Sequence, residues 1–572
     1  MPHHHDSSPQ AQALPRCVLL LPLALAACTD ASDPTATTEP LAWRDGTGSG
    51  SEGGESSEGL PGGPGEVFPP PYAVPGQWTF DEPVCGVEPD PTGGGIAQQL
   101  GIDPPIPPQP YVVPSCTPLQ EANDDCRVVH DAAELQQAAL LDPGKNMDII
   151  LDDGYYLESG LDDLVPHPAP YLSLARAHRL WAKDAGQAIL TFGVVAGGNY
   201  CNPAIAAKFD GPEFHGLVFD IMQAEHAVPL NAQPNAPTSA LMAWGHSRGM
   251  KVHDCWFRGW DAVDRAISAL RPDGLEIARV EVLNFERFGI LVELGWPPPE
   301  VCAAGPAPVV VGDPARLSDL AIHGIGDPEW SSQEVDPLCG NGAGPGAYCP
   351  GTQEHGIWIG ETTQVDRARI RDVAWTGILV GDDEDPIHRV TLRDVDVDDQ
   401  GSNEDGWGSG IGFEAGTDGT TLEQFCIGPN VRRGVHAEWN HHGDALDNVN
   451  LTIADGWSRA KYFGITLDSG TQDTSIIDVL IDEACLASTA MRNNNDILPY
   501  DDCCTTTTWT NLDDSGATNA CEVLSGNPPP LAQVLDEPDC TELQAQLVPS
   551  CAPFVDSDTA CLEVGGMDAC PP

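Results

Sequence analysis

From about residue 180 to residue 495, short apolar segments alternate with polar turns, and helical periodicity of useful length is hard to find. Two types of predicted strand recur. The first type begins with a glycine, as in GILVE at Gly289, GIWIG at Gly356, GILVG at Gly377, GIGFE at Gly410, GVHAE at Gly434 and GITLD at Gly464. The second type alternates strictly, as in VEVLNF from Val280 and VTLRDVDV from Val390. Strict alternation places the apolar residues of a strand on one buried face.

The spacing of the glycine starts predicts a repeating fold. Successive starts are 67, 21, 33, 24 and 30 residues apart. Spacings of 21 to 33 residues suit one coil of a solenoid with loops of variable length. The gap of 67 also contains an alternating strand and a Pro/Gly/Cys loop, so it exceeds one coil. An antiparallel sandwich is the alternative, which the recurring glycine start and the scarcity of two-residue hairpin turns disfavour.

The segment 128–157 predicts how the repeat begins. Asp131 and Glu134 have the spacing of a capping box, Leu135 and Ala138 lie on one helical face, and Pro143-Gly144 follows. A strand at 149–151, an Asp-Gly turn and a strand at 155–157 come next. This segment resembles the opening of pectin-lyase-like right-handed parallel β-helices, in which a short helix plugs the first coil. The resemblance implies an all-β right-handed parallel β-helix with an N-terminal capping helix.

The N-terminus predicts export. Residues 17–27 form an apolar run preceded by Arg16, which is typical of a signal peptide and too short to span a membrane as a mature helix. Leu25-Ala26-Ala27-Cys28 resembles the bacterial lipoprotein box, which implies lipidation of Cys28. Cleavage after an Ala-x-Ala-like site near Ala26 is the alternative. Thr29, rather than Asp, implies sorting to the outer membrane or the cell surface.

Composition divides the rest of the chain. We predict a signal peptide over 1–27, a disordered acidic Gly/Ser/Glu/Pro linker over 28–71, a Pro-rich strap over 72–127, the β-helix over 128–500 and a Cys-rich segment over 501–572. The chain has 19 cysteines, and removal of Cys17 and Cys28 leaves an odd number in an oxidising compartment. We therefore expect disulfides in the C-terminal segment and a free thiol at Cys255, which has apolar neighbours.

The charge limits the partners. Twenty-six Lys and Arg residues stand against 86 Asp and Glu residues, a formal net charge of −60. Such a surface repels nucleic acid, anionic lipid and polyuronates, and it attracts divalent cations. We expect no nucleic-acid partner and contact with a membrane only through the lipid anchor. Solubility or adaptation to high salt would explain the charge equally well.

Alignment of the glycine-started strands predicts a column of carboxylates. The second residue of each strand is expected to face inward, so the third and fifth face outward. Glu414, Glu438 and Asp468 occupy the fifth position of three successive strands. Adjacent members would lie about 5 Å apart and the outer two about 10 Å apart, which brackets the carboxylate separations of glycosidases. We assign Glu438 as general acid, with Glu414 or Asp468 as base or nucleophile. A solvated acidic face is the alternative.

Neighbouring residues complete the candidate site. His436 occupies the outward third position of the same strand as Glu438. Aromatic rings stack on the apolar faces of sugars, so we assign substrate binding to Trp358, Trp407, Trp439 and the nearby His441. Lyases of this fold class use Arg or Lys as base, and such bases are available at Arg248, Lys251, Arg287 and Lys461.

A second acidic locus suggests calcium. Asp394, Asp396 and Asp398 alternate with valines, so they are expected on one outward face as hard oxygen ligands. The spacing resembles the start of an EF-hand loop, but Asp399 stands where that loop has glycine.

Together these observations predict a cell-surface lipoprotein whose β-helix binds or cleaves a polysaccharide or cell-surface glycan, as a glycoside hydrolase or a polysaccharide lyase. The alternative is a non-catalytic adhesin or envelope scaffold that binds through the solenoid face. Fold does not fix function, so the two remain open at this point.

Overall fold

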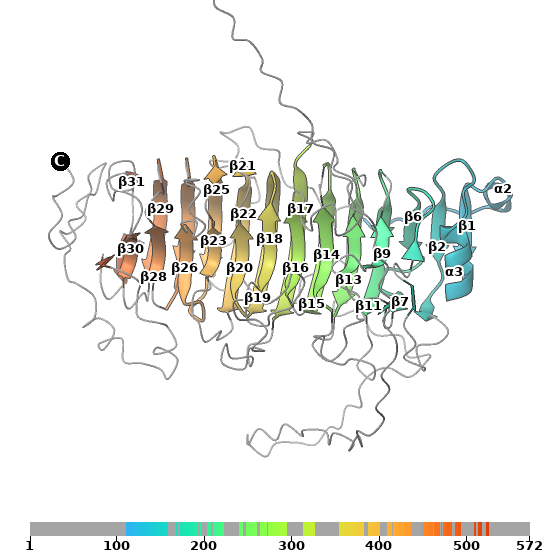
Figure 1. Cartoon of the computed structure of the whole chain (residues 1–572), viewed down its shortest axis with the longest axis horizontal. Helices are drawn as coiled ribbons and strands as arrows, with labels where there is room; N and C mark the ends of the chain where they lie inside the picture. Colours follow the sequence, from blue (N-terminus) through green and yellow to red (C-terminus); the bar gives the residue numbers. More distant parts are fainter. Residues whose placement is uncertain are drawn as a thin grey trace, which may run out of the picture. The chain divides into compact units, whose positions relative to one another are not determined.

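The computed structural model describes residues 110–157, 167–168, 172–192, 195–196, 203–207, 210–221, 239–243, 248–259, 263–270, 273–285, 287–293, 313–326, 354–381, 387–400, 409–414, 416–437, 448, 450–461, 463–468, 471, 473–482, 487–493, 508–510, 513–516 and 522–525. All of these residues belong to one compact unit, Gly59–Pro572. Its strands pair in parallel, and those of successive coils lie side by side (Figure 1). The chain is a right-handed parallel β-helix, as the sequence predicts.

Two long sheets form the walls of the solenoid. The 17-stranded sheet contains β1 (Cys126–Val129), β2 (Asp148–Leu151), β3 (Gly154–Leu157), β6 (Arg179–Ala182), β7 (Ala188–Phe192), β10 (Glu213–His215), β11 (Leu217–Ile221), β13 (Lys251–Arg258), β15 (Glu276–Phe285), β17 (Ala315–Ile325), β19 (Thr363–Val373), β22 (Thr391–Gln400), β25 (Thr421–Ile427), β27 (Thr452–Ser458), β29 (Ser475–Asp482), β31 (Thr508–Thr510) and β32 (Asp513–Gly516).

The 12-stranded sheet carries the glycine-started strands. It contains β5 (Leu172–Ser173), β9 (Pro203–Ala207), β12 (Ser239–Ala243), β14 (Arg265–Leu270), β16 (Phe288–Glu293), β18 (His355–Gly360), β20 (Thr376–Val380), β23 (Ser409–Phe413), β26 (Arg433–Ala437), β28 (Phe463–Asp468), β30 (Ala487–Asn493) and β33 (Glu522–Ser525). Two short pairs complete the described strands: β4 (His167–Pro168) with β8 (Val195–Ala196), and β21 (Ile387–His388) with β24 (Thr417–Asp418).

A left-handed backbone residue divides each long strand of the 17-stranded sheet into two limbs. The residues lie in register on successive coils and have φ between 50° and 57°; we call them the bend column: Asp254, Arg279, Asp319, Arg367, Asp394, Gln424, Asp455 and Asp478. A left-handed residue shifts the inward and outward alternation by one position. Val252 before the bend and Cys255 after it are therefore both buried in the interior.

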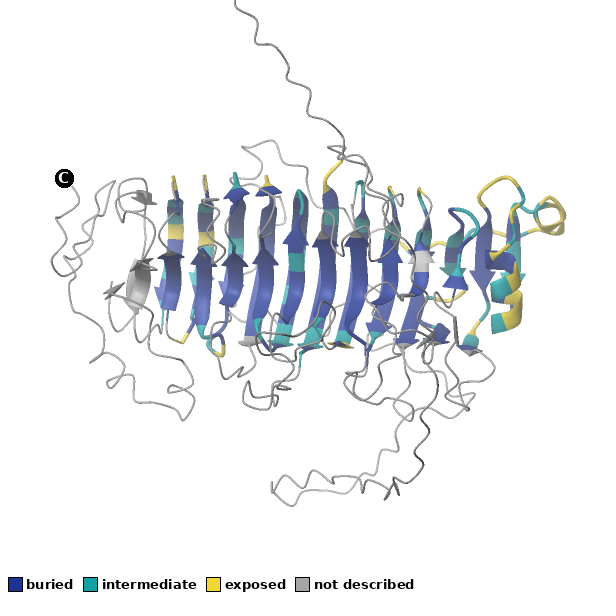
Figure 2. Ribbon diagram, viewed as in Figure 1, coloured by how far each residue is buried: buried dark blue, intermediate teal, exposed yellow. Residues whose placement is uncertain are grey.

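Stacked apolar side chains fill the interior. Phe219 and Phe257, from successive coils, stack with ring centroids 4.3 Å apart. Burial of one such side chain contributes roughly 1.5–3 kcal/mol, so the core grows with every coil added. Figure 2 shows the strands largely buried and one side of helix α3 (Ala132–Ala139) exposed. Among the described residues, no helix is long and apolar enough to cross a membrane.

The N-terminal cap matches the prediction in most details. Helix α3 (Ala132–Ala139) has Asp131 as N-cap, whose carboxylate accepts a 2.8 Å hydrogen bond from Glu134 N–H. Leu135 and Ala138 are buried against the first coil. The Glu134 carboxylate accepts from His130 N–H, one residue earlier than a capping box requires.

The described part of the Pro-rich strap, 110–127, contains a short helix that composition did not predict. Helix α2 (Pro118–Ala122) forms because Thr117 and Gln120 complete a capping box with proline in the first turn. A disulfide joins Cys116 to Cys126 at the first coil. The signal peptide, the linker, Cys28 and most of the Cys-rich segment lie outside the described residues.

Candidate functional site

The register of the 12-stranded sheet confirms the alignment by glycine. Ile357 pairs with Ile290 on one side and Ile378 on the other, and all three are fully buried in the interior. Gly289, Gly356 and Gly377 come directly before these isoleucines. A Cβ at Gly289 would lie 2.5 Å from the Gly356 carbonyl oxygen. The glycine start is therefore a steric requirement of the corner where each coil enters this sheet.

Glu414 lies against Gly381 of the preceding coil. Its N–H donates a 2.7 Å hydrogen bond to the Val380 carbonyl, and its side chain is half-buried. A Cβ on Gly381 would lie 2.2 Å from the Glu414 Cβ. One coil further back, the Trp358 indole Nε1 donates a 2.8 Å hydrogen bond to the Gly381 carbonyl. Trp358 and Glu414, two of the predicted site residues, thus lie on either side of Gly381, two coils apart.

His436 lies on the same sheet, in β26, but it is 2% exposed rather than open to solvent. Its Nδ1 lies 3.4 Å from Nη1 of the buried Arg433. A guanidinium can only donate, so Nδ1 accepts and the proton of the neutral ring resides on Nε2. His436 pairs in register with Gly412 and Thr466.

The other predicted members are less completely described. Leu467 pairs with Ala437, and Asp468 pairs in the backbone with Arg492 of β30. The side chain of Asp468 is not described. Glu438, Trp407, Trp439 and His441 lie outside the described residues. Their assignment as site residues remains a prediction.

The aspartates predicted to bind calcium face arginines of the neighbouring coil. Arg369 Nη2 lies 2.9 Å from Asp394 Oδ1, and Arg371 Nη2 lies 3.0 Å from Asp396 Oδ2. Burial raises the pKa of Asp394, although Arg369 opposes this shift. Asp398 accepts a 3.1 Å hydrogen bond from Asn430 N–H.

No group of three or more His, Cys, Asp or Glu side chains within the described residues is arranged to hold a metal ion. Calcium at Asp394, Asp396 and Asp398 remains a prediction that this geometry does not favour.

The sequence did not predict a buried polar cluster on the outward side of the 12-stranded sheet. Arg265 Nε lies 2.9 Å from Asp264 Oδ2, and the guanidinium carbons of Arg265 and Arg287 lie 5.3 and 4.9 Å from the Phe288 ring centroid. His355 beside them is 1% exposed, and neither ring nitrogen has a hydrogen-bond partner among the described residues. Burial, with Arg287 nearby, lowers the pKa of His355 to about 3.

In the sequence, this cluster could have been found from the residue directly before each glycine start. These residues form one outward column on successive strands: Phe288, His355, Thr376, Ser409, Arg433 and Phe463. The variety of residue types concealed their common position.

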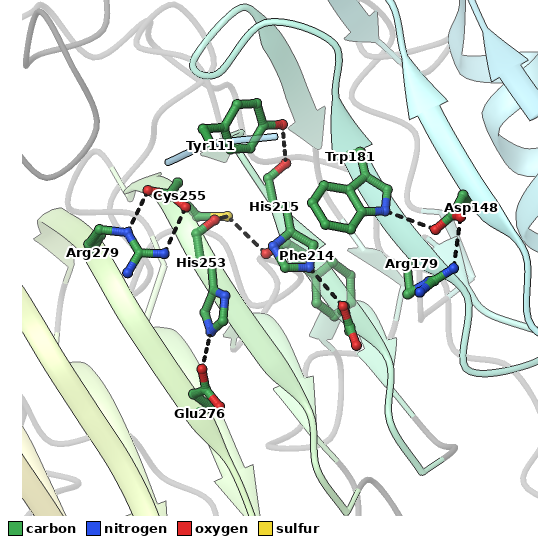
Figure 3. Close-up of polar contacts among 12 residues, drawn as sticks. Tyr111, Asp148, Arg179, Trp181, Phe214, His215, His253, Cys255, Glu276 and Arg279 are labelled. Atoms are coloured by element: carbon green, nitrogen blue, oxygen red, sulfur yellow. Dashed lines mark hydrogen bonds and ion pairs between the residues drawn. The ribbon is translucent and has the colours of Figure 1, made fainter. Parts of the chain in front are cut away.

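A second missed cluster lies on the 17-stranded sheet (Figure 3). Trp181 stacks on His215 with ring centroids 3.7 Å apart, and His253 on the next coil lies edge-on at 5.2 Å. Each imidazole Nε2 meets a carboxylate, at 3.0 Å for His215 with Glu213 and 2.9 Å for His253 with Glu276. Two histidine–carboxylate pairs therefore lie on adjacent coils.

Burial and hydrogen bonding set the protonation of this cluster. Burial lowers the pKa of His215, with Glu213 opposing the shift. Burial would raise the pKa of Glu213, but the hydrogen bond to His215 and the nearby Lys251 outweigh it, so this pKa is lowered. The hydrogen bond to His253 lowers the pKa of Glu276. Both carboxylates are therefore acceptors at neutral pH.

The strap contacts this second cluster from the side. The Tyr111 hydroxyl donates to the Ala182 carbonyl and lies 3.3 Å from the His215 carbonyl oxygen. Tyr111 occupies the space that a side chain at Gly216 would need, and Gly216 has a φ of 69°. Only glycine satisfies both conditions at this position.

No protein-family model matches the chain, and no curated protein matches it in sequence. Among solved structures, it is similar to the A-module of a mannuronan C-5 epimerase from Azotobacter vinelandii, at 10% identity and a TM-score of 0.39, with 69% of this chain and 98% of that one covered. It is also similar to an α-1,3-glucanase from Streptomyces thermodiastaticus, at 11% identity and a TM-score of 0.36, with 68% and 65% covered. These neighbours are parallel β-helix proteins, like this chain.

Proposed function

We propose that this protein binds or cleaves a neutral or weakly charged polysaccharide on the outward side of the 12-stranded sheet. The observation that carries the proposal is the contact of Trp358, Gly381 and Glu414 on three successive strands. The Trp358 indole and Glu414 flank Gly381 there, two coils apart, and the sequence continues the column of acidic residues on the next two strands. Aromatic and carboxylate groups together suit recognition of sugars.

The proposed chemistry uses three carboxylates in register. Phe413, Ala437 and Leu467 pair strand by strand, and the residues that follow them are Glu414, Glu438 and Asp468. Strands of successive coils lie about 4.8 Å apart, so neighbouring members suit a retaining glycosidase and the outer two approach the separation of an inverting one. Like charges this close raise the pKa of one member. We assign Glu438 as general acid and Glu414 or Asp468 as base or nucleophile.

His436 is assigned to hold the substrate or the carboxylates rather than to exchange protons with solvent. It is 2% exposed, and its Nδ1 accepts from Arg433. Trp407, Trp439 and His441 are proposed to contact sugar rings beside Trp358.

A non-catalytic adhesin or envelope scaffold is the second candidate. Leu291, Leu379 and Thr466 point outward from the 12-stranded sheet, but they are 1%, 5% and 1% exposed. At these described positions the sheet presents no open groove, and a scaffold needs none. The two candidates differ in whether a glycan is merely bound or is also cleaved.

The test is product release from a panel of polysaccharides, with and without calcium. Reducing-sugar release identifies hydrolysis, and absorbance of unsaturated products identifies elimination. Turnover by the wild type that Glu438→Gln abolishes would support the catalytic proposal. Binding without turnover on every glycan would favour the adhesin. Dependence on calcium, lost with Asp396→Asn, would be required for the predicted calcium site.

We further propose that Cys28 carries the lipid anchor and that the protein resides at the outer membrane or cell surface. The lipoprotein-box resemblance supports this proposal. Mass spectrometry of the mature N-terminus tests it, since a diacylated Cys28 is expected, and an unmodified N-terminus at another residue would contradict it.

A further inference from the structure

Outward side chains of alternating charge follow one another across the first limb of the 17-stranded sheet. They pair in register on six successive strands, and we call them the charge ladder: Asp148, Arg179, Glu213, Lys251, Glu276 and Arg316. Adjacent members are about 4.8 Å apart along the solenoid. We propose that the charge ladder is a second binding site, which takes a neutral oligosaccharide lying along the solenoid axis.

The ladder is accessible. The side chains of Arg179, Glu213 and Glu276 are 42%, 22% and 25% exposed, and Lys251 and Arg316 are half-buried. By contrast, Leu291, Leu379 and Thr466 on the outward side of the 12-stranded sheet are 1%, 5% and 1% exposed. A ligand can therefore reach the ladder without displacing any described part of the chain.

The ladder is not a requirement of the fold. In the next coil the same register position holds Gln364, and the four coils after it hold small hydroxyl residues, namely Thr391, Thr421, Thr452 and Ser475. Parallel pairing continues through these strands without charged side chains. The charges at the first coils are also weak stabilisers, because exposed ion pairs contribute about 0–1 kcal/mol.

The ladder satisfies itself internally only in part, at Asp148, which accepts a 2.7 Å hydrogen bond from Arg179. Glu213 and Glu276 pair with His215 and His253 instead of with Lys251, which lies between them. We call Trp181, His215 and His253 the inner row. Within the described part of the chain, the Lys251 ammonium forms no ion pair. The two carboxylates each retain further acceptor sites, and the ammonium retains its donors. Fixed acceptors and donors thus alternate on adjacent coils.

This alternation selects the ligand. A polyanion lying along the ladder would meet Glu213 and Glu276, and a polycation would meet Arg179, Lys251 and Arg316. A hydroxyl group donates to a carboxylate and accepts from an ammonium or guanidinium, so a chain of hydroxyls matches every step. A neutral saccharide is the common polymer with that property. Carboxylates held by fixed imidazoles also reduce the cost of ordering side chains on binding.

The inner row holds the acceptors in place. The Trp181 indole lies flat against His215 and donates a 3.0 Å hydrogen bond to Asp148, which also accepts from Arg179. His215 in turn fixes Glu213. A ligand therefore meets side chains whose positions are already set by the next layer of contacts.

This inference rests on the proposed function for its class of ligand, a neutral saccharide. The two sites lie on different sheets. The experiment is isothermal titration calorimetry of the full chain with neutral hexasaccharides of glucose, xylose and mannose. Oligogalacturonate and chitosan hexamers provide the two charged comparisons. We expect at least one neutral hexasaccharide to bind more tightly than both charged ones.

The variant Lys251→Thr/Glu276→Thr introduces the residue that later coils use at this position, and we expect it to weaken binding at least tenfold. Lys183→Thr is the matched control, since it removes an exposed ion pair with Asp152, four residues beyond the ladder on each strand, and it should bind as the wild type. Glu276→Gln, which keeps the shape of the side chain, serves if the double variant loses its cooperative melting transition. A threefold or greater loss is expected for it.

Several results would overturn the inference: no binding of any neutral hexasaccharide, tighter binding of a charged one, or wild-type affinity in folded ladder variants. Turnover assays separate the two proposals. Binding that depends on the ladder without any cleavage contradicts the catalytic part of the proposed function and leaves the ladder standing. Cleavage that depends on Glu438, with affinity unaffected by ladder variants, supports the catalytic part of the proposed function and contradicts the ladder as a binding site.

Discussion

Arg279 donates two hydrogen bonds to Asp254 of the preceding coil, at 2.8 Å from Nε and 3.0 Å from Nη2. Both side chains are 6% exposed. Both residues also belong to the bend column, with φ of 57° and 56°. The pair therefore links two coils at the point where each strand of the 17-stranded sheet divides into its two limbs.

Loss of one partner of this pair should destabilise the solenoid strongly. Arg279→Met leaves the Asp254 carboxylate buried without its counter-charge, and we expect a loss of about 3–5 kcal/mol in the free energy of unfolding. The double variant Arg279→Met/Asp254→Asn removes both charges and should recover part of that loss. Denaturant unfolding measures both values; equal stability of the single variant and the wild type would contradict this account.

His355 should make stability dependent on pH. Its pKa is about 3 in the folded protein, below the ordinary value of histidine near 6.5. Below pH 6.5 the unfolded chain takes up a proton that the folded chain does not, so stability falls until pH reaches about 3. Between pH 6.5 and 5 the loss should be about 2 kcal/mol.

The variant His355→Phe removes this proton uptake and places an aromatic ring beside Phe288 and Trp358, with which His355 already makes ring contacts. Its stability should change less between pH 6.5 and 5 than that of the wild type. Chemical denaturation at the two pH values provides the comparison. Identical pH dependence in both proteins would show that His355 is not responsible.

The glycine starts and the strict alternation were sufficient to predict the fold. Because each coil repeats the same corner, Gly289, Gly356 and Gly377 meet the same steric demand, and the signal recurs along the chain. The bend column was not predicted. Asp254, Arg279 and Arg367 adopt a backbone conformation that favours glycine, so residue type gives no warning of it.

The clusters outside the acidic column could not be found by spacing. Glu213, Lys251 and Glu276 lie in one register column but are 38 and 25 residues apart, because loop lengths vary. Only the strand pairing shows that they are neighbours. Burial was likewise hidden: the alternation predicted an outward position for His436, and the structure shows that this residue is 2% exposed.

Gly381 should be essential for the position of Glu414. In Gly381→Ala the new methyl group would collide with the Glu414 Cβ, and we expect a cost of about 1–3 kcal/mol in stability together with reduced turnover. Gly412→Ala is the matched control, since its nearest atom is the movable Leu379 Cδ1 at 3.0 Å. Thermal unfolding and activity assays compare the two; a larger effect at Gly412 would contradict the steric argument.

Cys255 should be unreactive in the folded protein. It is the free cysteine among the described residues, it is 1% exposed, and burial raises the pKa of its thiol. Alkylating reagents attack thiolates, so we expect peptide mapping to find Cys255 unlabelled under native conditions and fully labelled in denaturant. Rapid labelling in the native protein would refute the predicted burial.

The central claim is that the carboxylate column processes polysaccharide, and the most direct measurement is the turnover number of Glu438→Gln on the best substrate of the wild type. Loss of a general acid should lower turnover by about 10²- to 10⁴-fold, with substrate affinity little changed. The exposed Glu121→Gln should match the wild type. Turnover of Glu438→Gln within twofold of the wild type would contradict the claim.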